Sequence, residues 1–515
     1  MNNLQFPRAA ETAHKWEELH RKLSIALRLP HGQVQEGGAP HLADIDERLV
    51  QAIWSDQLLR QDSLATASGK AVRVIEPGRW NTGRGPDFLD ARLEIAGMIV
   101  EGDVEIHTES SGWQGHGHHK DFVYNRVVLH VVLRASNDRP YEERQNGSRL
   151  ERLVLEHFLE PDLDTIRQTV NLSDYPHGRP EGLGICHETF LRLPEPELTE
   201  FLLVSGRARI ESKVSRFITQ RQTADSQQVL YQALLTTQGF KASKTLYFLL
   251  SKRLPLAEVL DHARDVDHKD RTDFFLSLFL HVGRLMPDDE PEEIDDESRI
   301  FESRLRALWN PARPYFWDRL MPPTRRWFAG MRPAGFPTRR LTAVALLLGR
   351  LTDPRNPLMR QLEKLVREWN TDGLKPREIK ARFTALVELL IVDEPAHYFS
   401  RHFSFRGKEQ PPQALLGEPA SYSMLFNLVL PLMIMQSREA KDTALERQAW
   451  QVLHEFPALE KNSVVKFMTI RLFGETGRGK AFLARELYQQ AMLKVFGDCC
   501  AQNERTCDNC TLLAL

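Results

Sequence analysis

The sequence predicts an α+β protein of more than one domain, in which an N-terminal α/β unit is followed by a large all-α region. Two patterns predict this fold class. Short strand-like runs are confined to residues 71–133, and beyond residue 196 apolar residues recur three and four apart almost without interruption. The 515 residues exceed what one hydrophobic core usually serves, so we expect two or three domains. The hydrophobic fraction of 42% excludes a disordered or fibrous protein.

Composition also limits the function classes. The 68 Lys and Arg residues balance 70 Asp and Glu residues, and the net charge of −2 gives no global positive field for nucleic acid. The first residues lack the charged-then-apolar layout of a signal peptide. The longest apolar stretch, residues 424–435, is interrupted by Asn427 and Pro431 and is too short to span a bilayer. We therefore expect a soluble, cytoplasmic protein with no membrane partner. The sequence does not specify an oligomeric state.

The α/β domain is expected at residues 41–190, after a polar N-terminal extension at 1–40. A helix should open it, because Asp44 or Asp46 can cap the helix and apolar residues then recur at helical spacing. Strands are expected at 71–77, 90–95, 98–108 and 126–133. The last of these is nearly continuously apolar, which is typical of a strand that is covered on both faces.

The helical region is expected at residues 191–498, before a Cys-containing tail at 499–515. Its predicted helices share apolar residues three and four apart, and they cover 197–218, 227–237, 243–254, 272–286, 339–351, 378–391 and 480–496. The residues Gly474 to Lys480 match the spacing of a phosphate-binding loop, but Ala481 stands where Ser or Thr would ligate magnesium. We interpret this segment as a loop before the last helix.

Acidic and histidine side chains gather in the strand-rich unit. Asp103, Glu105 and His107 alternate along one predicted strand and therefore point to one face. Asp87, at the head of the preceding strand, meets Glu105 if the two strands pair. Converging carboxylates suit a hard divalent cation such as Mg²⁺ or Mn²⁺, which can activate water against a phosphodiester.

This order of residues resembles the restriction-endonuclease-like superfamily, whose core has an acidic helix, then PD, then (D/E)-x-K on a strand. Here the helix offers Glu47, the turn offers Pro86-Asp87, and the strand offers Glu105-x-His107. The resemblance implies that Asp87 and Glu105 hold the metal, that Glu47 completes the shell, and that His107 takes the place of Lys. Since His is charged only below about pH 6.5, this replacement points to altered metal use or to an inactive relative.

The chain also resembles DUF2851, a bacterial family of uncharacterised proteins. The residues that carry the likeness are Glu47-x-Leu49-x3-Ile53-Trp54, Asn81-x3-Gly85-Pro86-Asp87-Phe88, Gly102-Asp103-Val104-Glu105-Ile106-His107, Trp113-x2-His116-x-His118-x2-Asp121-x2-Tyr124 and Arg332-Pro333-x2-Phe336-Pro337-x2-Arg340. The terminal Cys group adds to them. The chain departs from the family pattern at Gly335, where Asn is expected. This family brings no established activity.

Two further sets of residues are candidate metal ligands. The pair His116-x-His118, with Asp121 nearby, can bind zinc together with His107, or the loop histidines can be exposed and idle. His130 lies in an apolar strand and is interpreted as a core histidine. In the tail, Cys507-x2-Cys510 has metal-binding spacing. Cys499 or Cys500 adds a third thiolate, and Cys186 or His187 adds a fourth ligand.

Four such soft ligands suit zinc or an iron–sulfur cluster. The arrangement of one early and three late cysteines is similar to that of some nucleases in the same superfamily, which close their domain with an iron–sulfur cluster. The alternative is that these thiols are reactive or idle.

Basic residues at Arg209, Lys213 and Arg216 fall three and four apart, so they share one helix face. That face is either solvated or a groove for phosphates. Three hypotheses follow: a metal-dependent nuclease or phosphodiesterase acting on DNA or RNA; a non-catalytic nucleic-acid-binding or scaffold protein with a degenerate nuclease fold; and a zinc-dependent hydrolase that uses His107, His116, His118 and Asp121.

Overall fold

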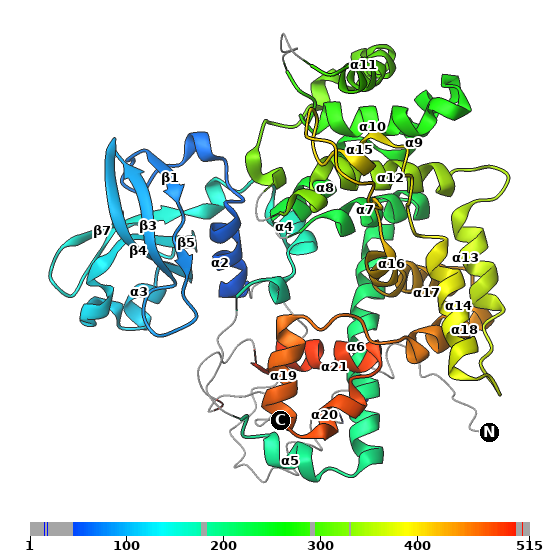
Figure 1. Ribbon diagram of the computed structural model, residues 1–515. Helices are drawn as coiled ribbons and strands as arrows, with labels where there is room; N and C mark the ends of the chain where they lie inside the picture. Colours follow the sequence, from blue (N-terminus) through cyan, green and yellow to red (C-terminus); the bar gives the residue numbers. More distant parts are fainter. Residues whose placement is uncertain are drawn as a thin grey trace. The chain divides into compact units, whose positions relative to one another are not determined.

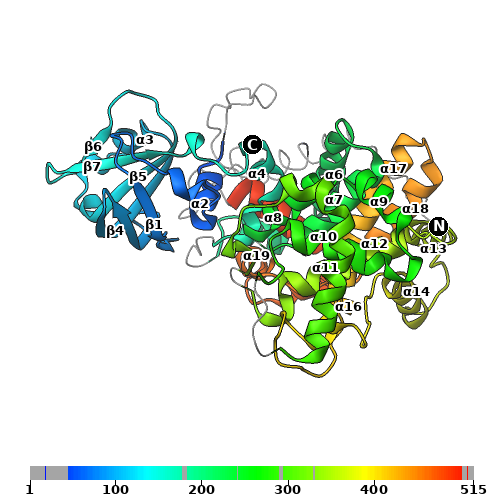
Figure 2. The ribbon, with the colours of Figure 1, turned by 90° about the horizontal axis from the view of Figure 1, so that it is seen from above.

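The computed structural model describes residues 45–176, 183–240, 242–288, 294–328 and 331–500, together with Lys15, Glu18 and Cys507. Residues 45–176 lie in one compact unit, which is built around a β-sheet and also includes Cys499, Cys500 and Cys507. The residues from 183 to 498 form a second unit, which is helical (Figures 1 and 2). The predicted fold class is confirmed, because a mixed α/β region precedes a largely helical region.

The α/β unit contains a seven-stranded mixed sheet with the strand order β1-β3-β4-β5-β7-β6, and β2 pairs with β3. Its strands are β1 (Val72–Glu76), β2 (Arg79–Trp80), β3 (Phe88–Ile95), β4 (Met98–Glu109), β5 (Val127–Arg134), β6 (Tyr141–Glu143) and β7 (Arg149–Val154). The strand β5 runs parallel to both β4 and β7, and the other pairs are antiparallel. All four predicted strands form, while β2, β6 and β7 were not predicted.

The helix α2 (Glu47–Asp56) opens this unit and covers one face of the sheet (Figure 1). Asp46 caps it, because its side chain accepts a hydrogen bond from the backbone N–H of Arg48 at 2.9 Å. Ile53 and Trp54 are fully buried and pack in one core with the apolar residues of β3, β4 and β5. The helix ends at Gln57, which adopts a left-handed conformation (φ 52°).

A β-bulge interrupts the pairing of β3 with β4 between Phe88 and Ala91. Asp90 lies in it with a left-handed φ of 59°. The carboxylate of Asp103 accepts a hydrogen bond from the Asp90 backbone N–H at 3.1 Å. Asp103 is therefore engaged in holding the bulge, and the next two residues on its face, Glu105 and His107, lie farther along β4.

The helical unit has one extensive apolar core. Its helices are α5 (His187–Arg192), α6 (Glu195–Arg221), α7 (Ser226–Gln238), α8 (Ala242–Arg253), α9 (Leu256–His262), α10 (Arg271–Val282), α11 (Asp296–Phe316), α12 (Pro337–Leu351), α13 (Leu358–Arg367), α14 (Pro376–Glu388), α15 (Tyr398–Arg401), α16 (Glu418–Met424), α17 (Leu430–Glu439), α18 (Thr443–Glu455), α19 (Ser463–Phe473), α20 (Gly477–Phe482) and α21 (Glu486–Val495).

The end of this unit differs from the prediction of one helix over residues 480–496. Two helices, α20 and α21, cover this stretch, and the chain leaves the helical conformation between them. The segment that matches phosphate-loop spacing follows helix α19 rather than a strand, and its last residues lie in α20. It therefore lacks the strand–loop–helix context of a phosphate-binding loop.

One described helix, Glu418–Glu439, is long and apolar enough by composition to cross a membrane. It comprises α16, the π-helical turn Leu425–Val429 and α17. Within the most apolar 18-residue stretch of this helix, 72% is buried inside the protein. Such burial is typical of a core helix in a soluble protein.

Candidate functional site: a buried histidine cluster

A row of polar side chains crosses one face of the sheet where β4, β5 and β7 run parallel. Glu105 pairs with His130, and His130 pairs with Arg152, so the three side chains lie side by side on the same face. Their apolar neighbours in sequence point to the opposite face and join the core beneath α2, namely Val104, Ile106, Leu129, Val131 and Leu153. Glu105, His130 and Arg152 are all buried. Burying such groups is costly unless they are paired, so this row requires an explanation.

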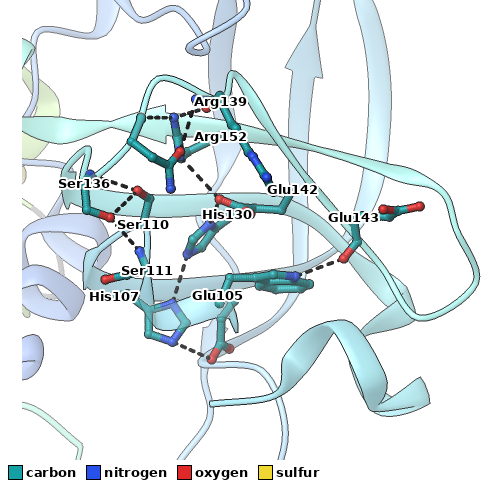
Figure 3. A network of polar contacts seen from close by, with 12 residues as sticks. Glu105, His107, Ser110, Ser111, His130, Ser136, Arg139, Glu142, Glu143 and Arg152 are labelled. Carbon is teal, nitrogen blue, oxygen red and sulfur yellow. Dashed lines mark hydrogen bonds and ion pairs between the residues drawn. The ribbon is translucent and has the colours of Figure 1, made fainter. Parts of the chain in front are cut away.

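The segment after β4 folds over this row. Ser110 and Ser111 form hydrogen bonds with Ser136, which follows the end of β5. The hydroxyls of Ser110 and Ser136 lie 2.8 Å apart, and the Ser111 N–H donates to Ser136 Oγ at 2.9 Å (Figure 3). The helix α3 (Gly112–Gly115) follows, and its Trp113 is fully buried with its indole N–H donating to the Glu143 carbonyl at 3.0 Å. The ring of Trp113 packs against His130, with centroids 5.4 Å apart.

Three histidines converge at the end of β4. His107 Nε2 lies 3.1 Å from His116 Nδ1, and the ligand atoms of His107, His116 and His118 all lie within 4.8 Å of one another. Among the residues that the structure describes, this is the one group of three metal-ligating side chains that converges in this way. His107 and His118 are buried, whereas His116 is exposed. The cluster is therefore reachable from solvent on the His116 side.

Glycine at position 112 makes this approach possible. A Cβ atom on Gly112 would lie 2.4 Å from Cδ2 and 2.5 Å from Cγ of His107. Such distances are far inside van der Waals contact, so any side chain here would displace the imidazole. The close contact between the start of α3 and the His107 ring thus depends on the absence of a side chain.

The carboxylate of Glu105 lies beside the histidines. Its Oε1 is 3.0 Å from His118 Nε2 and 3.8 Å from His107 Nε2. His118 Nε2 is buried and makes no hydrogen bond in the structure, although Glu105 Oε1 lies 3.0 Å from it. A buried ring nitrogen without a hydrogen bond fits an atom that ligates a cation.

Burial keeps these histidines neutral. The pKa of His107 is lowered to about 2, mainly by burial and in addition by charge repulsion from the neighbouring His130, His116 and His118. Burial also lowers the pKa of His118 to about 4, against an opposing effect of Asp121. The pKa of His116 is lowered by burial and by His118. Neutral imidazole is the form that binds metals.

Asp87 and Glu105 are adjacent, as predicted. The backbone N–H of Asp87 donates to Glu105 Oε2 at 3.1 Å. The Asp87 carboxylate accepts hydrogen bonds from the Ile106 N–H at 2.9 Å and from the side-chain amide of Gln51 at 3.0 Å. The contact of Gln51 was not predicted, although its place one turn after Glu47 on the buried side of α2 is a usable signal. Glu47 itself is half-buried at the first position of α2.

The residues of this site lie in a region that a family model recognises. The model described as Protein of unknown function (DUF2851) matches residues 47–463. The chain belongs to this family. In this DUF2851 protein the matched region begins at the first residue of α2 and includes the whole histidine cluster. No curated protein and no solved structure matches the chain.

The other predicted ligands of the DUF2851 protein have different surroundings. Asp121 accepts a hydrogen bond from the Val123 N–H at 3.0 Å and so caps the turn Phe122–Arg126. Cys186 is buried at the start of α5, and the neighbouring His187 points its Nδ1 at the Leu472 carbonyl, 3.0 Å away.

Three of the tail cysteines lie within the described residues and one does not. Cys499 is buried and Cys500 is half-buried in the π-helical turn Phe496–Cys500, while Cys507 is half-buried. Cys510 lies outside the described residues. The predicted metal at the Cys tail therefore stays a prediction.

The predicted basic face turns toward other helices. Arg209 Nε donates to Gln490 Oε1 at 3.1 Å, and Lys213 Nζ donates to Asn427 Oδ1 at 2.5 Å. Burial lowers the pKa of Lys213 well below its usual value. These two side chains connect α6 with α21 and with the π-helical turn Leu425–Val429. Arg216 is exposed. The contacts assign Arg209 and Lys213 to packing between helices.

Proposed function

We propose that this chain is a zinc-dependent hydrolase whose metal is held by His107, His116 and His118. The observation that carries the proposal is the convergence of three imidazoles that remain neutral, one of which has a buried nitrogen without a hydrogen bond. Three histidines with a fourth position open to water are a common donor set for catalytic zinc. The exposure of His116 favours such an open site over a closed structural one.

Zinc bound in such a site lowers the pKa of a coordinated water to about 7 and so supplies a nucleophile at neutral pH. The chain would supply the base. Glu105 Oε2 is held by the Asp87 N–H, which leaves Oε1 on the side of the histidines. From there Oε1, 3.0 Å from His118 Nε2 and 3.8 Å from His107 Nε2, would take a proton from a water held at these histidines. Asp121 is assigned to the loop that carries His118 rather than to the ligand set.

The test measures two quantities, the zinc content of the protein and its rate of hydrolysis. The substrates are an ester, p-nitrophenyl acetate, and a phosphodiester, bis-p-nitrophenyl phosphate. The zinc-loaded protein should cleave at least one, and Glu105→Gln should lose cleavage by about 10²-fold or more while it keeps its zinc. Exposed His157→Ala is a matched control that should keep both. Zinc binding without cleavage of either compound would favour the non-catalytic reading.

A second candidate is a Mg²⁺- or Mn²⁺-dependent phosphodiesterase, and the adjacency of Asp87 and Glu105 favours it. In this reading His107 cannot replace the permanent charge of Lys, because its lowered pKa keeps it neutral. Its role would be that of a base. Cleavage of labelled DNA or RNA that needs Mg²⁺ or Mn²⁺, is lost in Asp87→Asn and persists in His116→Ala would establish this candidate against the zinc hydrolase.

A further inference from the structure

Behind the histidine cluster, a chain of polar contacts runs across the sheet (Figure 3). His107 Nδ1 lies 2.9 Å from His130 Nε2. His130 Nδ1 faces Glu142 Oε1 at 3.7 Å, and Glu142 Oε1 lies 3.4 Å from Arg152 Nη1. His107, His130, Glu142 and Arg152 are each more than nine-tenths buried. These contacts connect the exposed rim of the site with strand β7.

The far end of this chain is fixed in place. Arg152 Nη1 donates to Asn137 Oδ1, and Arg152 Nη2 donates to the Asn137 carbonyl, both at 3.0 Å. Arg152 Nη2 also donates to the Arg139 carbonyl. The loop between β5 and β6 thus fixes the guanidinium of Arg152. The guanidinium in its place forms an ion pair with Glu142. His130 is clamped between neighbours, because it pairs with Glu105 and Arg152 in the sheet and Trp113 packs on its ring.

The contacts favour one arrangement of the ring protons, although His130 Nδ1, 3.7 Å from Glu142 Oε1, makes no hydrogen bond in the structure. A carboxylate attracts the N–H of a facing imidazole, so Glu142 favours the proton of His130 on Nδ1. His130 Nε2 then carries a lone pair and accepts from His107 Nδ1–H. This leaves Nε2 of His107 as a lone pair directed toward His116 and Glu105, which is the atom and the side of the ring where a metal would bind.

We propose that His130, supported by Glu142 and Arg152, is a positioning residue that fixes the tautomer and the ring orientation of the zinc ligand His107. The inference rests on the proposed zinc site and adds to it the residues that prepare its most buried ligand. Metal-bound histidines generally donate their second ring N–H to such a partner, and loss of that partner weakens metal binding. Here the partner is a second histidine, and the charge partner of that histidine, Glu142, lies on β6, two strands away in the sheet order.

Two substitutions of His130 separate positioning from simple filling of space. The amide of His130→Gln can accept from His107 Nδ1–H and donate toward Glu142, whereas His130→Leu fills a similar volume and does neither. In a competition titration with a chromophoric chelator, His130→Leu should weaken zinc binding by about 10- to 100-fold, and His130→Gln should restore most of it. Equal zinc affinity in wild type and His130→Leu, with both folded, would overturn the proposal.

A measurement on the unmodified protein covers the case in which His130→Leu does not fold. Nitrogen-15 NMR of histidine-labelled protein reports which ring nitrogen carries the proton. With zinc bound, His107 should be protonated on Nδ1, and His130 should be protonated on Nδ1 and free of a proton on Nε2. A proton on His130 Nε2 would overturn the positioning role while the zinc site stands. Failure of wild type to bind zinc would instead overturn the proposed function.

Discussion

His107 Nε2 and His116 Nδ1 lie 3.1 Å apart, although the two residues are nine positions apart in the sequence. Two imidazole nitrogens on one tetrahedral zinc, each about 2.0–2.1 Å from the metal, would be about 3.3–3.4 Å apart. The pair is therefore already close to the spacing that a shared metal requires. In the structure the same contact has the length of a hydrogen bond between the two rings.

The first prediction concerns the amount of bound zinc. His116→Ala removes one of three ligands, so the zinc content should fall by one equivalent per chain while the fold persists, because His116 is exposed. Elemental analysis after dialysis against zinc measures it, with His157→Ala as the control. Any zinc held by the cysteine tail stays the same in both variants, and an unchanged total in His116→Ala would contradict the site.

The second prediction uses two glycines of one short helix. Gly112→Ala places a methyl group 2.4 Å from the His107 ring, whereas a Cβ at Gly115 meets nothing within 4 Å. Gly112→Ala should therefore lower zinc affinity by at least 10-fold, and Gly115→Ala should leave it unchanged. The same chelator competition measures both, and similar affinities in the two variants would show that the ring of His107 can move without loss.

The third prediction is a dependence of stability on pH in metal-free protein. The folded state keeps His107 and His118 neutral, with pKa values of about 2 and 4, whereas the unfolded chain protonates them near pH 6.5. Their contribution to the free energy of unfolding is present above pH 6.5 and is lost as the pH falls toward the folded pKa values. In that window each histidine lowers the free energy of unfolding by about 1.4 kcal/mol for each unit by which the pH falls.

Urea unfolding with a chelator present, at several pH values between 7.5 and 4.5, measures this dependence. In His107→Gln the slope should fall by about one proton, or about 1.4 kcal/mol per pH unit. The control His157→Ala should keep the slope of wild type. An identical slope in His107→Gln would mean that His107 is protonated in the folded protein.

The fourth prediction concerns Asp87. Its carboxylate accepts from Gln51 and from the Ile106 N–H, so Asp87→Ala leaves two donors without their partner. We expect a loss of about 1–3 kcal/mol for each donor that stays unpaired, and a smaller loss in Asp87→Asn, which keeps one acceptor. Thermal unfolding measures the stability of each variant, and the melting temperature should fall from wild type to Asp87→Asn to Asp87→Ala. Equal melting temperatures for wild type and Asp87→Ala would show that water replaces the carboxylate.

The fifth prediction tests packing in the helical unit. A Cβ on Gly206 of α6 would lie 2.2 Å from the Leu487 carbonyl of α21, whereas a Cβ on Gly477 meets nothing within 4 Å. Gly206→Ala should destabilise this unit by about 1–3 kcal/mol, and Gly477→Ala should not. Denaturant unfolding followed by circular dichroism compares the two variants, and a neutral Gly206→Ala would mean that the helices can separate without cost.

Much of the fold was predictable because its signals are local. The cap at Asp46, the apolar spacing of α2 and the alternating or apolar runs of β1, β3, β4 and β5 each depend on a few adjacent residues. The strands β6 and β7 were missed because Tyr-Glu-Glu is short and Arg149–Val154 mixes charged with apolar residues. Parallel pairing of β5 with β7 is a contact between distant residues that no local pattern encodes.

The candidate site was predictable to the same extent. The adjacency of Asp87 with Glu105 follows from the pairing of two predicted strands, and the His116-x-His118 pattern was recognised as a zinc alternative. The interpretation of His130 as a core histidine is correct for its burial but misses its contact with His107. Glu142 and Arg152 could not be assigned, because their strands were not predicted.

All three proposed ligands occur between residues 107 and 118, and the groups that support His107 end at Arg152. Every residue of the proposed metal site therefore precedes α6 in chain order. During synthesis on the ribosome, where domains fold as units from the N-terminal side, these side chains can come together before α6 is translated. If the proposed zinc site is correct, a ribosome-bound chain stalled shortly after the α/β unit has left the exit tunnel would already hold zinc.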